Sequence, residues 1–492
     1  MFLGIDIGTS GVKAVLVDGD QRMVAQANEA LTVARPEPLW SEQDPGSWWR
    51  ATRAAVAALK AEAPDALGAV EGIGLSGQMH GATLLDESDR VLRPAILWND
   101  GRSASQCEAL EAAEPRSREI TGNLAMPGFT APKLLWIAEH EPDVFRQTNK
   151  VLLPKDYVRL LMTGEYASDM SDAAGTLWLD VAARDWSEPM LAATGLTMDH
   201  MPRLVEGSAP SGTLRPEVAA EWGMGASVVV AGGAGDNAGG AAGIGVVAPG
   251  EAFLSLGTSG VLFVANEGFA PNPAQAVHAF CHCLPGTWHQ MSVILSAASC
   301  LTWLAGLTGA ESEAALLAEA AESPARADDP LFLPYLSGER TPHNDPHARG
   351  VFFGLALATD RGALCRAVLE GVAFAFADGQ DALANAGTAI GDVAVIGGGA
   401  RSAYWGQILA NVLDRPLGYH EGGEVGPAFG AARLGRLAVT DEAVADVCTA
   451  PPVRESIAPA QGGHDFHSAR RQHFAALYGE LAGRFSAHMA QQ

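Results

Sequence analysis

The alternation of apolar and polar residues predicts strands and helices along most of the chain, and one combination of them occurs twice. Residues 2–13 contain an apolar strand, the turn Gly-Thr-Ser-Gly and a second apolar strand. Residues 253–263 repeat this order around a second Gly-Thr-Ser-Gly turn. Each copy predicts a β-hairpin with a short glycine loop.

Two further patterns recur in the same order along the chain. An apolar strand that runs into glycines occupies residues 68–77 and again 391–399, and a helix of small residues occupies 236–243 and again 426–433. Three ordered repeats indicate a duplicated chain. With the alternation of strand-like and helix-like segments, they predict an α/β protein of two similar lobes around a central cleft, with domains at residues 1–247 and 248–492.

Composition restricts the class of partner. The 492 residues include 32 basic and 57 acidic side chains, which gives a formal net charge of −25, and 48% of the residues are hydrophobic. A strongly acidic chain lacks the basic surface that nucleic acid or an anionic membrane requires. We therefore expect a soluble globular protein with neither as its main partner.

The cysteines and the hydropathy predict a location. Six cysteines are scattered along the chain, only Cys281 and Cys283 are close in sequence, and no second Cys/His pair has zinc-site spacing. The chain enters a strand at once, without a cleavable targeting segment. The long apolar stretch 226–250 is interrupted by Asp236 and by glycines. These features predict a protein of the reduced cytoplasm.

The glycine loops predict phosphate binding. Glycine lets backbone N–H groups approach an anion closely, and Thr and Ser hydroxyls add donors. The triple glycine 397–399 permits a similar close approach to a nucleoside. Asp6 lies on the strand before the first loop, where its carboxylate either holds Mg²⁺ or caps the turn.

Asp236 is the candidate general base. It is the one ionisable residue in the run of small residues 231–240, at the predicted start of the small-residue helix. An aspartate there also serves as a helix N-cap, and the residues alone leave both interpretations open.

With these segments assembled, the chain resembles the FGGY family of carbohydrate kinases over its whole length. Residues 130–140 match one family signature, and residues 350–370 nearly match the second, departing at Ala363. Six short segments are most similar to family members that phosphorylate D-xylulose; these are residues 39–45, 77–81, 97–102, 153–157, 168–175 and 337–342.

The resemblance implies the duplicated actin-like (ribonuclease H-like) ATPase fold, with ATP and Mg²⁺ as cofactors and a possible homodimer. It implies phosphorylation of D-xylulose to D-xylulose 5-phosphate, with Asp236 as general base and Asp6 as the metal residue. The sugar site would comprise Met79 and His80, with Gln78 and Asn237 as neighbouring candidates. The expected ATP-binding residues are Gly8, Thr9, Ser10, Gly257, Thr258, Gly398, Gly399 and Ala400.

Two alternatives follow from the same features. One keeps the family and changes the sugar to ribulose or another polyol. The other is an actin-like or chaperone-type ATPase whose nucleotide drives assembly or client binding. The duplicated core occupies nearly the whole chain, which leaves little for a client-binding domain and favours a kinase. Stimulation of ATP turnover by sugar distinguishes the classes.

Overall fold

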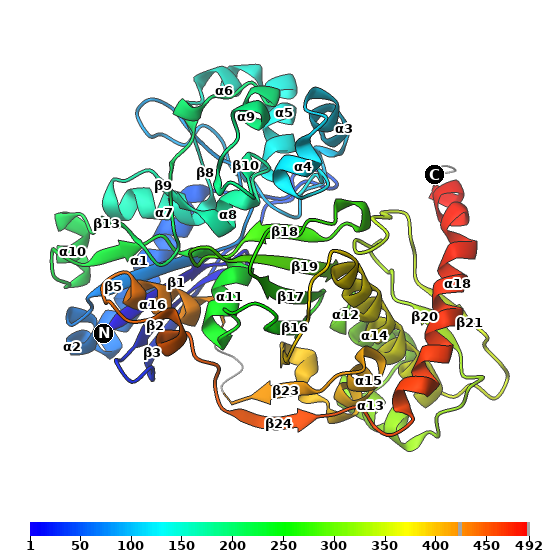
Figure 1. The fold of residues 1–492 in the computed structure, drawn as a ribbon. Coiled ribbons are helices and arrows are strands. Elements are labelled where there is room, and N and C mark those ends of the chain that lie inside the picture. The colour runs from blue at the N-terminus through cyan, green and yellow to red at the C-terminus, as the bar shows by residue number, and fades with distance from the viewer. Residues whose placement is uncertain (422–425, 490–492) are drawn as a thin grey trace.

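The computed structural model describes residues 1–421 and 426–489, and two large mixed sheets form its framework (Figure 1). The first sheet runs in the order β13 (Pro210–Thr213), β14 (Val229–Ala231), β5 (Gly72–Gly77), β1 (Phe2–Ile7), β2 (Gly11–Val17) and β3 (Met23–Ala30), with β15 (Ala234–Gly235) beside β5. The second runs β18 (His278–Cys281), β19 (Trp288–Ile294), β17 (Gly260–Asn266), β16 (Ala252–Leu256), β22 (Val393–Ile396), β23 (Leu417–His420) and β24 (Val453–Ile457).

The two sheets share one core topology. In each, a hairpin pairs antiparallel (β1 with β2, and β16 with β17), and its first strand pairs parallel with a later glycine-rich strand (β5 or β22). The predicted duplication is therefore confirmed, because the three strands at the centre of each sheet come in the same order from the two halves of the chain.

Helices cover both faces of the first sheet. One face packs against α1 (Pro45–Glu62), α2 (Pro64–Gly68), α7 (Pro154–Thr163) and α10 (Pro216–Trp222), and the other against α16 (Pro427–Leu437). Side chains alternate between the faces of a strand. Leu3 and Ile5 therefore face the first group of helices, whereas Phe2, Gly4 and Asp6 face α16.

A group of short elements lies above the two sheets in Figure 1. Its helices are α3 (Ala104–Ala113), α4 (Ser117–Thr121), α5 (Thr130–His140), α6 (Pro142–Gln147), α8 (Met170–Ala174) and α9 (Glu188–Ala193). Its strands, together with those that connect it to the first sheet, are β4 (Glu42–Gln43), β6 (Thr83–Leu85), β7 (Ala95–Ile96), β8 (Lys150–Leu152), β9 (Ala167–Asp169), β10 (Leu179–Asp180), β11 (Asp185–Trp186) and β12 (Arg203–Val205).

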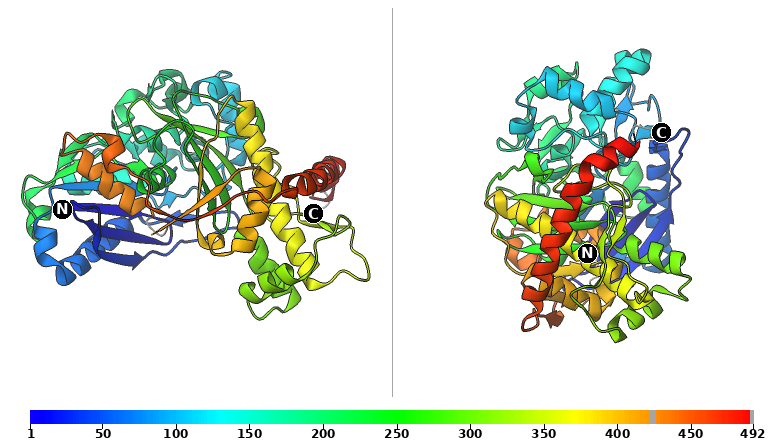
Figure 2. Two further views of the ribbon diagram at one scale, coloured as in Figure 1. Left: turned by 60° about the horizontal axis from the view of Figure 1, so that its bottom comes forward. Right: turned by 90° about the vertical axis from the view of Figure 1, so that its right-hand side faces the viewer.

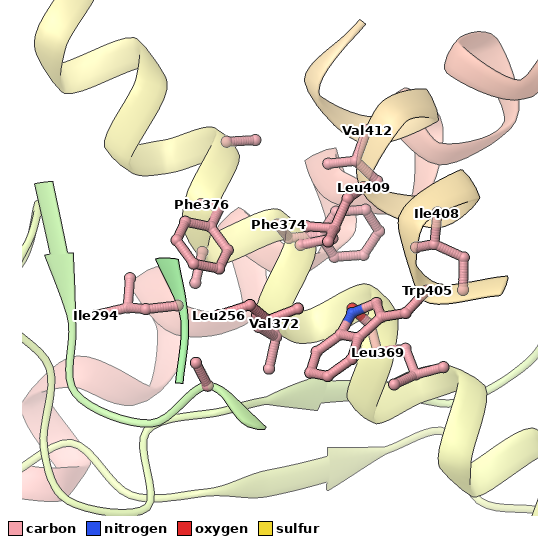
Figure 3. Packing of buried hydrophobic residues seen from close by; sticks show 14 of the residues in the cluster. Leu256, Ile294, Leu369, Val372, Phe374, Phe376, Trp405, Ile408, Leu409 and Val412 are labelled. Carbon is pink, nitrogen blue, oxygen red and sulfur yellow. The ribbon is translucent and has the colours of Figure 1, made fainter. Parts of the chain in front are cut away.

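The second sheet packs against the long helix α14 (Arg361–Asn385) and its neighbours α12 (Ala298–Thr308), α13 (Glu313–Glu322) and α15 (Ala403–Leu413). Figure 3 shows Trp405 of α15 lying against Leu369 and Val372 of α14 in this core. The strands β20 (Leu331–Leu333) and β21 (Val351–Phe353) and the helix α17 (Val444–Val447) complete the elements. Helix α18 (Gly463–Met489) lies on the outside, and the termini are at opposite ends of the molecule (Figure 2).

Helix α11 (Asp236–Ile244) crosses α16 at unusually short range. A Cβ atom at Gly430 of α16 would lie 1.8 Å from the carbonyl oxygen of Gly239 in α11, so only glycine fits. These are the two small-residue helices that the sequence repeats, and their close approach explains their composition. Because α16 packs on the first sheet, the second half of the chain contributes to the first lobe; the boundary between residues 247 and 248 stays a prediction.

Within residues 1–421 and 426–489, every helix is too short or too polar to cross a bilayer.

Candidate active site

The first glycine loop is a tight turn held from below by polar side chains. The N–H of Gly8 donates to the carbonyl oxygen of Gly11 at 3.0 Å, which closes the hairpin. The hydroxyl of Thr9 donates to Gln78 Oε1 at 2.9 Å and accepts from Trp98 Nε1 at 3.0 Å. The Thr9 hydroxyl is thus engaged within the protein, and Ser10 is the exposed hydroxyl of the loop.

Gln78 lies beneath this loop with both ends of its amide engaged. Its Nε2 donates to Gln43 Oε1 at 2.9 Å and to the carbonyl oxygen of Gly8 at 3.5 Å, while Oε1 accepts from Thr9. The side chain is buried, with 2% exposure. These contacts make Gln78 a support of the first loop, and its contact with sugar stays a prediction.

The second glycine loop rests on the beginning of a helix. The N–H groups of Ala297 and Ala298 donate to the carbonyl oxygens of Thr258 and Gly257, at 2.9 and 2.8 Å, directly before and at the start of α12. Ser299 Oγ also donates to the Thr258 carbonyl oxygen at 2.7 Å. The Thr258 backbone thus lies beside the positive end of the α12 dipole, and its side chain is exposed.

The triple glycine adjoins this second loop. Gly397 has φ of +93°, in the left-handed region that favours glycine. A Cβ atom at Gly399 would lie 2.5 Å from Cγ of Leu256, the residue before Gly257, whereas Gly398 has open space around it. Ala400 belongs to the same short 3₁₀ turn, Gly398–Arg401. The structure therefore brings 398–400 next to the predicted phosphate loop.

Asp236 is the first residue of α11 and does not cap it. The N-cap position belongs to Gly235, and Asp236 Oδ1 accepts from the backbone N–H and the Nδ2 of Asn237, at 2.7 and 2.9 Å. This geometry removes the N-cap interpretation. Burial raises the pKa of the Asp236 carboxyl to about 6, although the bonds from Asn237 oppose the shift. Such a carboxylate is ionised at neutral pH and still basic enough to take a proton.

Asp6 lies on β1 with one oxygen unused. Its Oδ1 is buried and has no hydrogen-bond partner among the described residues. Burial, followed by the negative charge of Asp236, raises the pKa of the Asp6 carboxyl to about 7. The two carboxylates are therefore close enough to repel each other. A cation beside Asp6 would satisfy the free oxygen and relieve the repulsion, which is the environment that Mg²⁺ prefers.

No group of three or more His, Cys, Asp or Glu side chains able to hold a metal occurs within the described part of the chain. Mg²⁺ is commonly held by one or two carboxylates, water and substrate phosphates. Asp6 fits this mode of binding and not a closed protein cage.

His80 follows β5 and is held in a single orientation. Its φ is +69°, rare for a residue with a side chain, and its Nδ1 lies 2.6 Å from the carbonyl oxygen of Gly175. Burial, and then the charge of Lys133, lowers the pKa of His80 to about 3, so the ring is neutral. Because Nδ1 donates its proton to Gly175, Nε2 carries the free lone pair, an acceptor for a hydroxyl group.

Met79 connects His80 to Asp236. The side chain is buried, and a Cβ atom at Gly175 or at Gly235 would come within 2.8 or 2.9 Å of it. Met79 therefore touches the residue that precedes the candidate base. The structure brings Met79, His80, Asp236 and Asn237 into one neighbourhood.

Comparison with known proteins shows the family of the chain. Residues 1–243 match the model of the FGGY family of carbohydrate kinases, N-terminal domain, and residues 252–439 match its C-terminal domain. The chain belongs to the FGGY family of carbohydrate kinases. It is 57% identical to a xylulose kinase of Escherichia coli over 98% of this chain and 99% of that protein, and 38% identical to one of Bacillus subtilis over 88% and 87%.

Solved structures agree with the fold of this FGGY chain. A xyloylose kinase from Brucella ovis superimposes with a TM-score of 0.96 at 55% identity, covering 98% of this chain and 99% of the other. The xylulose kinase from Rhodospirillum rubrum gives 0.92 at 33% identity, with 99% of both chains covered. Both structures agree with the duplicated actin-like fold. As a member of the family, the protein is a carbohydrate kinase, which is a phosphotransferase.

His80 of this FGGY protein has two aromatic neighbours that no sequence pattern indicated. The His80 ring lies 4.8 Å from Phe129, edge to face, and 6.4 Å from Phe280 of the second sheet. His278, on the same strand as Phe280, bonds Arg340 Nη1 through Nε2 at 3.1 Å. These residues come from distant segments with ordinary core composition, so no local pattern marks them.

Proposed function

We propose that this FGGY kinase transfers the γ-phosphoryl group of ATP to D-xylulose and forms D-xylulose 5-phosphate. The observation that carries the proposal is the 57% identity, over nearly the full length of both chains, to a protein named xylulose kinase. The positions of Asp236, His80 and the two glycine loops suit this reaction.

Asp236 is the general base of the proposed reaction. Asn237 holds Oδ1 through two hydrogen bonds, which leaves Oδ2 to accept the proton of the sugar's terminal hydroxyl as that oxygen attacks the γ-phosphorus. With a pKa of about 6, the carboxyl is ionised at neutral pH.

His80 and Met79 recognise the sugar in this proposal. The neutral His80 ring presents Nε2 as an acceptor for a sugar hydroxyl, and its bond to Gly175 fixes the direction of the lone pair. Met79 adds an apolar surface between His80 and the loop before Asp236. The sugar would thereby be oriented with its terminal hydroxyl at the base.

The glycine loops bind ATP in this proposal. Thr258, exposed at the start of α12, donates its hydroxyl to the phosphates, and Gly398 to Ala400 lie along the nucleoside end. Mg²⁺, when bound, neutralises charge on the phosphate oxygens. Asp6, with its free buried Oδ1, is the residue that would hold it.

The test measures ADP release from Mg-ATP with a panel of pentuloses, polyols and aldoses. The proteins are wild type, Asp236→Ala and the control Asp465→Ala, which removes an exposed acid from the first turn of α18. We expect strong stimulation by D-xylulose in wild type and the control, and its loss in Asp236→Ala. A different preferred sugar would correct the substrate, and turnover indifferent to every sugar would refute the kinase.

The six cysteines lie buried as free thiols, which supports the proposed cytoplasmic location. The homodimer is also a proposal, based on the family resemblance, and sedimentation of the purified protein would test it.

A further inference from the structure

Beneath the loop that precedes Asp236 lies a cluster of buried charges. Lys155 Nζ is 2.8 Å from Asp156 Oδ1, 2.8 Å from Asp169 Oδ1 and 2.9 Å from Asp172 Oδ2. Arg159 joins the cluster through Asp156 at 3.3 Å. All five side chains are fully buried.

The cluster combines three acids with two cations. Burial raises the pKa of Asp172 well above its ordinary range, although the charge of Lys155 opposes the shift. Buried ion pairs add little stability compared with apolar side chains of the same volume, because desolvation offsets their attraction. Stability therefore does not explain the cluster, and its hydrogen bonds indicate another role.

One line of hydrogen bonds runs from the cluster to the candidate base. Asp169 Oδ2 accepts from the backbone N–H of Ser171 at 2.8 Å and also from the Ser171 hydroxyl, so it caps α8. Ser171 Oγ in turn accepts from the N–H of Gly235 at 3.1 Å. Gly235 is the N-cap of α11, and Asp236 follows it.

A second line holds the other end of the same loop. Arg159 Nη1 donates to the carbonyl oxygen of Ala231 at 2.8 Å, and Nη2 donates to that of Gly232. Residues 231–235 consist of glycine and alanine, so the loop has no polar side chain of its own to fix it. The cluster holds it at residues 231, 232 and 235, in addition to the pairing of β15 with β5 and the backbone bonds that Gly232 and Gly233 donate to the segment before β13.

We propose that Ser171, oriented by Asp169 and Lys155, is a positioning residue that fixes the backbone before Asp236 and thereby aims the base at the sugar hydroxyl. The proposal deepens the proposed function and rests on Asp236 acting as the base. It assigns to Ser171 no contact with substrate. Removal of its hydroxyl would leave the Gly235 N–H without its acceptor, and the start of α11 would shift within the limits that the pairing of β15 with β5 sets.

The test compares Ser171→Ala with the control Ser168→Ala. Ser168 is also fully buried, three residues away on β9, but its Oγ has no hydrogen-bond partner in the described structure. We expect Ser171→Ala to lower kcat for D-xylulose about 10- to 100-fold, since small misplacements of reacting groups have effects of this size. The KM for Mg-ATP should stay unchanged, because the ATP loops lie in other segments. Ser168→Ala should behave as wild type.

Two readouts separate positioning from a general loss of stability. Rates are expressed per folded molecule, and the acid limb of the kcat–pH profile should move in Ser171→Ala because the surroundings of Asp236 change. Ser171→Thr keeps the hydroxyl, so its kcat and the acid limb of its kcat–pH profile should match those of wild type. If the alanine variant does not fold, Ser171→Cys keeps the volume with only a weak acceptor and should show the same loss.

The outcomes distinguish this inference from the proposed function. Wild-type kcat and an unmoved acid limb in Ser171→Ala, with active wild-type enzyme, would overturn the positioning role alone. A wild-type enzyme that no sugar stimulates would instead overturn the proposed function.

Discussion

Replacement of Asp6 by asparagine should make the ligand-free protein more stable while abolishing its activity. Burial and the charge of Asp236 raise the pKa of Asp6 from 3.8 to about 7. A carboxyl whose pKa is higher in the folded state binds its proton more tightly there than in the unfolded chain. It favours folding below pH 3.8, and this contribution is lost as the pH rises through 7. Above that pH the folded protein carries an unfavourable ionised group.

The size of the effect follows from the shift. Each unit of pKa is worth about 1.4 kcal/mol, so, relative to acid pH, the raised pKa of Asp6 lowers the stability of the fold by about 4 kcal/mol at pH 8 and by about 2 kcal/mol at pH 5, where only the unfolded chain is ionised at this residue. Asp6 is only partly buried, so these values are upper limits. An asparagine side chain is uncharged at both pH values, and the variant Asp6→Asn should gain up to these amounts in free energy of unfolding.

Urea unfolding at pH 5 and pH 8, with EDTA and without nucleotide, measures the gain. Asp392→Asn, a change at an exposed acid near the second sheet, is the control and should show no such pH-dependent gain. Addition of Mg-ATP should stabilise wild type more than Asp6→Asn. A variant that is less stable than wild type at pH 8, or whose gain does not grow with pH, would refute the reasoning.

Four further perturbations have defined outcomes. The kcat/KM for sugar should fall about tenfold per pH unit below about pH 6, where Asp236 becomes protonated; a profile flat down to pH 5 would contradict its role as base. His80→Ala should raise the KM for sugar about tenfold or more and leave the KM for ATP unchanged in steady-state kinetics, because the proposed sugar site uses the Nε2 that the bond of Nδ1 to Gly175 leaves free. Gly430→Ala should lower the unfolding free energy by about 2 kcal/mol or more, because its methyl group meets a backbone oxygen 1.8 Å away. Gly240→Ala, which points into open space on α11, should be neutral or stabilise by up to about 1 kcal/mol.

The framework of the fold was predictable because short segments of the sequence determine its hairpins. The hairpins around Gly8 and Gly257 need only a glycine turn between apolar strands, and the repeat itself indicated duplication. The reason for Gly4 and Gly74 was not predictable. A Cβ atom there would lie 1.8 and 1.7 Å from carbonyl oxygens of α16, more than 350 residues away in sequence. The sequence shows the glycine at such a contact, but it does not show which distant residue the glycine contacts.

The site was predictable where one residue stands out from its neighbours. Asp236 is an acid among small residues, so its importance was visible, but the choice between base and N-cap required the position of Gly235. The sugar contact predicted for Gln78 stays a prediction, and the bonds of its amide to Thr9 and Gln43 join partners that no spacing reveals. The role of Ser171 depends in the same way on Gly235, 64 residues further along the chain.

The small-residue helices connect the two carboxylates of the candidate site through closely packed backbone. Asp236 begins α11, which crosses α16 where Gly239 meets Gly430. Helix α16 in turn lies on β1 at Gly4, two residues before Asp6 and on the same face of the strand. Asp236 and Asp6 are thus connected through two contacts of backbone against backbone, with no flexible side chain between them. Closely packed backbone yields little, so we expect the proposed base and the residue proposed to hold Mg²⁺ to move as one rigid unit. A larger residue at either crossing would change their separation as well as the stability.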